Sequence, residues 1–181
     1  MSRLKCGVVL ALALISCQAA GSSREGALRA GWTGSDTGQL SGFAVAEWCD
    51  EQRRLEIRII KGDTGLALAV FPEVVLSPDT FRVVAAGAKD STPPSARVAL
   101  RWFAATAISG FQGDSGTVVL EQTDSGQLAG WLAARASSVS NSDRVTVTGD
   151  FQNLAVIRQT RGCTADSALE SAESGDTDHV D

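Results

Sequence analysis

The chain has 181 residues, a formal net charge of −5 and a single histidine. This acidic balance argues against a nucleic-acid-binding protein, because such proteins gain most of their affinity from Lys and Arg contacts to phosphate. The length suffices for one domain with one hydrophobic core.

The first sixteen residues have the features of an export signal. Arg3 and Lys5 give a positive start, and the apolar run CGVVLALALIS (6–16) follows. This run is too short to cross a bilayer as a helix, which needs about 20 apolar residues. We therefore expect residues 1–16 to be a signal peptide, and a plain N-terminal anchor helix is the weaker interpretation.

The end of this run, Leu14-Ile15-Ser16-Cys17, resembles the lipobox of bacterial lipoproteins. In that family the leader is cleaved just before the cysteine, whose thiol then carries diacylglycerol. The resemblance implies lipidation at Cys17 and a place in the bacterial cell envelope, and Gln18 favours the outer membrane. Ordinary cleavage near Ala19 or Ala20 would instead release a soluble periplasmic or secreted protein.

Residues 17–31 are small and polar, which is typical of a flexible tether between a lipid and a domain. We therefore expect a single folded domain over residues 32–163.

Alternation of apolar and polar side chains dominates this domain and predicts strands with one buried face. The alternation is strict at 54–61, 97–103 and 144–151, and more evenly apolar runs at 66–71 and 153–158 predict central strands. The stretch 130–138 is predicted to be a strand rather than a helix. With Gly, Asp, Ser and Pro between these segments, the pattern predicts an all-β fold, an antiparallel β-sandwich or small β-barrel of about 8–10 short strands.

The triplet Asp-Ser/Thr-Gly occurs four times, each beside a strand-like run, beginning at Asp36, Asp63, Asp114 and Asp124. Asp can accept a hydrogen bond from its own backbone two residues on, and Gly adopts positive φ without steric cost. The triplet therefore suits a hairpin turn or a bulge.

These triplets lie in two pairs of longer segments with similar sequences: 36–46 resembles 124–134, and 61–70 resembles 112–121. They fit one turn-then-strand pattern used repeatedly, or an old hairpin duplication.

Gly113-Asp114-Ser115-Gly116 also resembles the sequence around the nucleophilic serine of trypsin-like proteases. Such a serine needs a base, usually His, oriented by an acid. The histidine here is His179, near the C-terminus, whereas in that family the histidine and the acid both precede the motif. Lys61 or Lys89 could form a Ser-Lys arrangement, but no local spacing supports it. We therefore interpret Ser115 as part of a turn.

The triplets also resemble the Asp-Thr/Ser-Gly motif of aspartic proteases, in which two aspartates share a proton. That family has an apolar residue before the Asp, whereas Ser35, Gly62, Gly113 and Thr123 stand there in this chain. Calcium binding by the Asp-rich turns is a third interpretation, without an EF-hand or nonapeptide pattern to support it. We expect no catalytic residue, no cofactor and no metal ligand.

Tryptophan can stack on sugars or line an apolar pocket, so each of the four tryptophans is a possible ligand-binding residue. Trp48 is next to Cys49 and is expected to pack in the core, and Trp102 falls on the buried side of its strand. Trp32 and Trp131 are the better candidates for an exposed ligand-binding surface.

Residues 164–181 carry six acidic residues and no Lys or Arg, and we expect them to form a disordered acidic tail.

The chain has four cysteines with different expected fates. Cys6 leaves with the signal peptide and Cys17 takes the lipid, so Cys49 and Cys163 are left as an even pair in an oxidising compartment. This predicts a disulfide between them. A redox or metal-binding pair is the alternative, but the chain has no CxxC motif.

These features favour a lipid-anchored, non-catalytic envelope or surface protein. Its partners would be a membrane, through the N-terminal lipid, and another envelope protein or a glycan. The alternative is a calycin-like carrier of an apolar ligand, which should enclose a cavity on the order of several hundred Å³. A secreted hydrolase is the least supported function.

Overall fold

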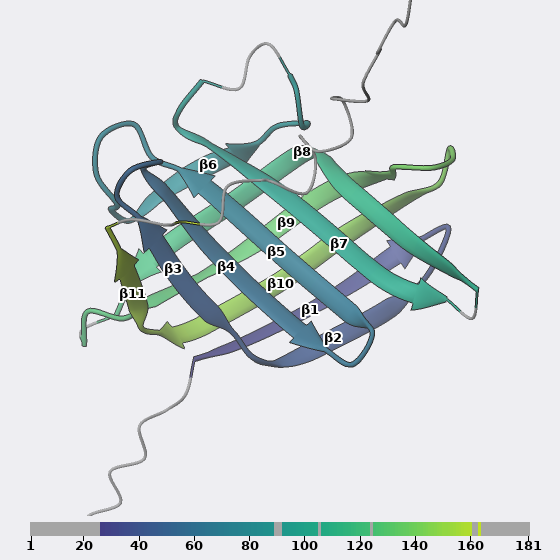
Figure 1. Ribbon diagram of the computed structural model, residues 1–181, viewed down its shortest axis with the longest axis horizontal. Helices are drawn as coiled ribbons and strands as arrows, with labels where there is room; N and C mark the ends of the chain where they lie inside the picture. The colour runs from purple at the N-terminus through teal and green to yellow at the C-terminus, as the bar shows by residue number, and fades with distance from the viewer. Residues whose placement is uncertain (1–25, 89–91, 105, 124, 161–162, 164–181) are drawn as a thin grey trace, which may run out of the picture.

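The computed structural model describes residues 26–88, 92–104, 106–123, 125–160 and 163 (Figure 1). No helix occurs among these residues, and the all-β prediction is confirmed. The eleven strands, in chain order, are β1 (Ala27–Gly34), β2 (Gly38–Phe43), β3 (Val45–Cys49), β4 (Arg54–Lys61), β5 (Thr64–Phe71), β6 (Asp79–Val83), β7 (Ser95–Ala104), β8 (Ala107–Gln122), β9 (Leu128–Ser138), β10 (Arg144–Leu154) and β11 (Val156–Gln159).

All eleven strands belong to one sheet, in the order β11-β3-β4-β5-β7-β6-β8-β9-β10-β1-β2. Pairing is antiparallel throughout, except that β11 runs parallel to β3 and β6 runs parallel to β7. Figure 1 shows β3, β4, β5 and β7 crossing in front of β9, β10 and β1. The sheet therefore curls over itself, and its inner face encloses the core.

The two ends of the curled sheet are joined by the chain itself. Ala44 alone separates β2 from β3, and Ala155 alone separates β10 from β11. The backbone N–H of Ala44 also donates to the carbonyl of Gly26, just before β1, at 3.1 Å. The strand count exceeds the expectation of about 8–10 short strands because these single residues divide two continuous runs.

The core is built from the inward-facing side chains of every part of the sheet. Leu28, Leu55, Leu68, Leu132 and Phe151 are among the fully buried residues. An aromatic stack crosses this core: the ring centroids of Trp32 and Trp102 lie 5.3 Å apart, and those of Trp102 and Phe111 lie 5.0 Å apart. The middle of the barrel-like fold is therefore occupied by the protein's own side chains.

The predicted disulfide is confirmed. Cys49, the last residue of β3, is bonded to Cys163, with a Cα–Cα distance of 5.8 Å across a sequence separation of 114 residues. In the chain-entropy model a loop of this length contributes at most about 4–5 kcal/mol to the free energy of unfolding. The bond also ties the end of the described chain to the strand where the sheet closes.

Two expected boundaries differ from the structure. β1 begins at Ala27, inside the segment expected to be a tether, because Leu28 and Ala30 are buried in the core. The run 153–158 is not one central strand: Leu154 ends β10, and β11 lies at the end of the sheet with Ile157 exposed. By contrast, 66–71 is central, because β5 lies between β4 and β7.

Candidate functional site

Trp131 projects outward from the first half of β9. Its strand alternates between buried and more exposed positions, with Leu128, Gly130 and Leu132 facing the core. Trp131 is 43% exposed, so its indole ring is partly open to solvent. Its neighbour on β10 is Asp150, and its neighbour on β8 is Val119.

A trough lies beside Trp131 on the outer face of β9, β10, β1 and β2, with a volume of about 790 Å³. Its depth comes from small residues at two outward positions. Gly31 on β1 and Ala133 on β9 both pair with Thr148 on β10, so little side-chain volume covers the backbone there. The trough is therefore a product of strand register, with the indole of Trp131 at its side.

The polar groups of the trough come from three neighbouring strands. Arg29 on β1 pairs with Asp150 on β10 and with Ser41 on β2. Gln39, on the outer face of β2, faces Gly31. A carboxylate, a guanidinium, an amide and a hydroxyl thus follow the indole ring across three successive strands, which allows stacking at one side of the trough and directional hydrogen bonding across it.

The other tryptophan expected at an exposed surface, Trp32, is buried. It is 6% exposed, and its ring packs so closely on Gly38 that a Cβ there would lie 2.2 Å from the ring. The expectation of an exposed Trp32 is therefore wrong. β1 already alternates from Leu28, and this alternation directs Trp32 inward.

Ser115 lies at a β-bulge within β8 rather than at a hairpin turn. The register between β8 and β9 shifts between Gly113 and Ser115, leaving Asp114 as the extra residue. At this point β8 stops pairing with β7 and pairs with β6 instead. The other three triplets lie at the β1–β2, β4–β5 and β8–β9 connections. The three copies that are fully described thus lie at bends of the chain, in two different settings.

The hydroxyl of Ser115 donates to the Asp114 carboxylate at 3.1 Å, and Ser137 donates to the same carboxylate at 2.7 Å. The cross-strand partner of Ser115 is Arg135, whose guanidinium offers hydrogen-bond donors and no acceptor. Lys61 donates to the carbonyl of Ser41, whereas Lys89 and His179 lie outside the described residues. Within the part of the chain that is described, the group that accepts the Ser115 hydroxyl proton in a hydrogen bond is therefore the Asp114 carboxylate, and neither a histidine nor a lysine is found beside it.

Metal ligation by the acidic turns finds no geometric support in the described ranges. No group of three or more His, Cys, Asp or Glu side chains gathers there in a way that could hold an ion.

The predicted lipidation site, Cys17, lies outside the described residues, as do the signal peptide and the acidic tail at 164–181. Those predictions stay predictions. Within the described ranges, no helix has the length and hydrophobicity needed to span a membrane.

Comparison of the chain with protein-family models, with curated proteins and with solved structures finds no match in any of the three. We therefore infer a function from the surface chemistry of this fold.

The glycine of the bulge generates a testable prediction. Gly116 has a φ of +135°, and a Cβ there would lie 2.2 Å from the carbonyl oxygen of Ala133. We expect Gly116→Ala to lower the free energy of unfolding by about 3 kcal/mol or more, because backbone strain and a backbone clash act together. Chemical denaturation of the purified variant measures this loss.

Gly62 provides the matched control, since its φ is +56° and no atom lies within 4 Å of the place that a Cβ would occupy. We expect Gly62→Ala to cost only about 1 kcal/mol, from backbone conformation alone. Equal losses in the two variants would contradict the close approach of β8 and β9 at the bulge.

Proposed function

We propose that this protein is a lipid-anchored, non-catalytic bacterial envelope protein whose folded domain binds a glycan through the trough beside Trp131. The single observation that supports glycan binding is the combination of a 43% exposed indole ring with polar side chains on adjacent strands. A sugar ring presents an apolar C–H face and a rim of hydroxyl groups. The indole matches the first, and Arg29, Asp150 and Gln39 match the second.

The envelope location and the anchor follow from the leader. A positive start, a short apolar run and Cys17 at its end all support export followed by lipidation. A diacylated cysteine with an additional acyl chain would hold the domain firmly at a membrane, whereas a single chain binds weakly.

The carrier alternative has weaker support from the interior of the fold. An apolar ligand in the middle of the barrel would have to displace the stacked rings of Trp32, Trp102 and Phe111. A hydrolase has the least support, because the described surroundings of Ser115 offer it a carboxylate and an arginine rather than the histidine or lysine that usually activates a serine.

Glycan binding is tested with an immobilised panel of bacterial-envelope oligosaccharides that includes peptidoglycan fragments. We expect the wild-type chain to bind at least one member, and Trp131→Ala to weaken that binding by about tenfold or more, as for a buried aromatic contact. Phe103→Ala is the matched control, because Phe103 is 51% exposed on β7, away from the trough. No binding by the wild type, or equal losses in both variants, would contradict the proposal.

The anchor is tested by metabolic labelling with radioactive palmitate in bacteria that express the full chain. We expect label on the wild type and none on Cys17→Ala, because the acylated thiol is then absent. Absence of label on the wild type would refute lipidation at Cys17.

A further inference from the structure

A second cavity lies on the outer face of β4, β5 and β7, separate from the trough beside Trp131. Ala67, Ala69 and Ala99 face outward there, so the floor consists of methyl groups. The segment after β6 folds over β7: the N–H of Val84 donates to the carbonyl of Ala96 at 2.9 Å, and Val84 and Ala86 line one wall. The cavity has a volume of about 180 Å³.

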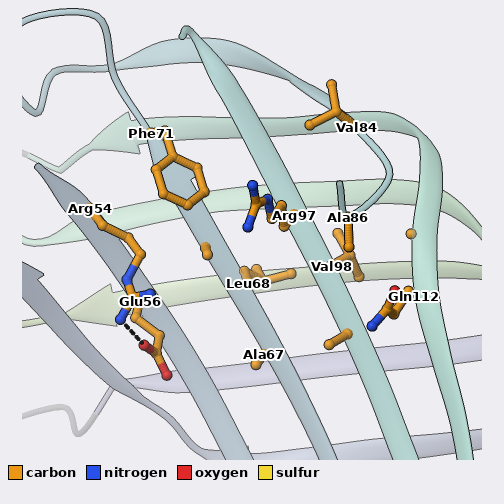
Figure 2. Close-up of a pocket in the computed structure, with 13 residues that line it drawn as sticks. Arg54, Glu56, Ala67, Leu68, Phe71, Val84, Ala86, Arg97, Val98 and Gln112 are labelled. Carbon is orange, nitrogen blue, oxygen red and sulfur yellow. Dashed lines mark ion pairs between the residues drawn. The ribbon is translucent and has the colours of Figure 1, made fainter. Parts of the chain in front are cut away.

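Three charged residues line this cavity: Arg54 and Glu56 on β4, which form an ion pair with each other, and Arg97 on β7. Figure 2 shows the guanidinium of Arg97 between Phe71 on one side and Val84 and Ala86 on the other. The guanidinium carbon lies 5.3 Å from the centroid of the Phe71 ring. The Nε atom is buried and has no hydrogen-bond partner among the described residues.

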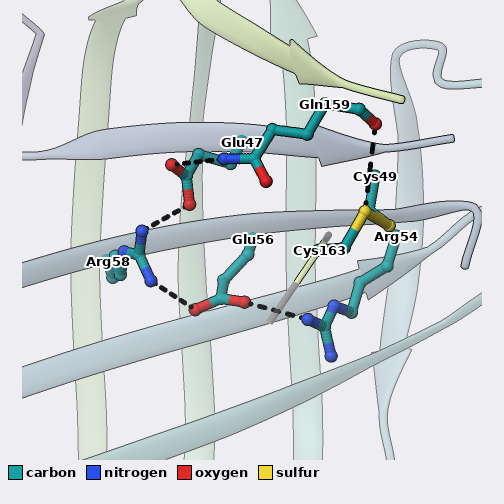
Figure 3. Close-up of polar contacts among 7 residues, drawn as sticks. All are labelled: Glu47, Cys49, Arg54, Glu56, Arg58, Gln159 and Cys163. Carbon is teal, nitrogen blue, oxygen red and sulfur yellow. Dashed lines mark hydrogen bonds and ion pairs between the residues drawn. A yellow bond between two sulfur atoms is a disulfide. The ribbon is translucent and has the colours of Figure 1, made fainter. Parts of the chain in front are cut away.

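The carboxylates of Glu47 on β3 and of Glu56 on β4, the second of which lines the cavity, are paired with other arginines, as Figure 3 shows. Glu56 is paired with Arg54 at 3.2 Å and with Arg58 at 3.5 Å. Glu47 is paired with Arg58 and also accepts a hydrogen bond from the amide of Gln159 at 3.0 Å. Neither carboxylate neutralises Arg97, which makes no ion pair with any described residue.

A half-buried cation beside an apolar floor is costly unless an anion and hydrogen-bond acceptors accompany it. Ala69 separates Arg97 from Glu56 across the sheet, since it pairs with both. The space above Ala69 therefore lies between the guanidinium of Arg97 and a carboxylate that is already paired with two other arginines. A hydrogen-bond acceptor for Arg97 would have to come from a bound ligand.

We propose that this cavity binds a small monocarboxylate with a compact apolar body. The carboxylate would accept hydrogen bonds from the guanidinium of Arg97 in the paired geometry that arginine favours, and the apolar body would contact Ala69, Ala99 and Phe71. An apolar cavity of about 150 Å³ holds benzene, so a volume near this size suits a ligand such as benzoate.

The test is a titration of the purified chain with sodium benzoate, followed by calorimetry and by broadening of the benzoate proton signals. Benzyl alcohol, which has the same ring without the charge, is titrated in parallel. We expect saturable binding of benzoate and at least about tenfold weaker binding of benzyl alcohol.

Arg97→Gln is expected to weaken benzoate binding by about tenfold or more. Arg101→Gln is the matched control, because Arg101 lies further along β7, is exposed, and alters the net charge equally. We expect it to leave the affinity unchanged. Ala69→Leu, which fills the floor and keeps the charge, should also abolish binding, and thermal unfolding verifies that each variant is folded.

The absence of saturable benzoate binding would overturn the proposal. So would equal affinity for benzyl alcohol, or an equal loss in Arg97→Gln and Arg101→Gln. Should Arg97→Gln fail to fold, Ala69→Leu together with the comparison of the two ligands still decides the outcome.

Discussion

The structure depends on burying the row of apolar side chains that each strand contributes on one of its faces. Burying apolar surface contributes about 25 cal/mol per Å², and a sheet with no covering helix can achieve this only against another part of itself. The single sheet therefore curls until β3, β4 and β5 face β9, β10 and β1 across a common core. Continuous chain at Ala44 and Ala155 joins the ends of this curl, and the Cys49–Cys163 bond holds the chain that follows β11 against β3, the strand with which β11 pairs.

Because side chains fill the interior, the candidate binding surfaces lie on the outer face of the sheet. Both depressions described there arise where outward positions carry small residues: Gly31 and Ala133 in one case, and Ala67, Ala69 and Ala99 in the other. Each lies beside an aromatic ring, Trp131 or Phe71. Outward positions contribute little to the core, so they are free to take residues that shape a binding surface.

The elements that are best predicted from sequence are those with local signals. Period-two alternation identifies the strands β4, β7 and β10, and the even pair of cysteines that remains after the expected signal peptide and lipidation site identifies the disulfide. The error at Trp32 has a local cause as well. Placing the domain boundary at residue 32 hides the preceding alternation of Leu28 and Ala30, which directs the ring inward.

The sequence predicts Trp131 as an exposed aromatic residue, but the polar partners of Trp131 and the cavity at Arg97 could not be predicted, because they depend on register between distant strands. Arg29 and Asp150 lie far apart in the chain and become neighbours only when β1 pairs with β10. Likewise, Arg97 is distinctive only because Glu56 is already engaged by Arg54 and Arg58. The Gly113–Gly116 segment shows the same limit. Its residue types predict a bend, but they do not tell whether the bend connects two strands or forms a β-bulge within one strand.

Ligand binding outside a filled core is tested most directly by the indole N–H signals of the ¹⁵N-labelled protein. During titration with an oligosaccharide that the chain binds, we expect a progressive shift of the Trp131 signal. The Trp32 and Trp102 signals should stay in place. Movement of the Trp32 and Trp102 signals, with Trp131 unchanged, would put the ligand inside the barrel and contradict binding at the outer face.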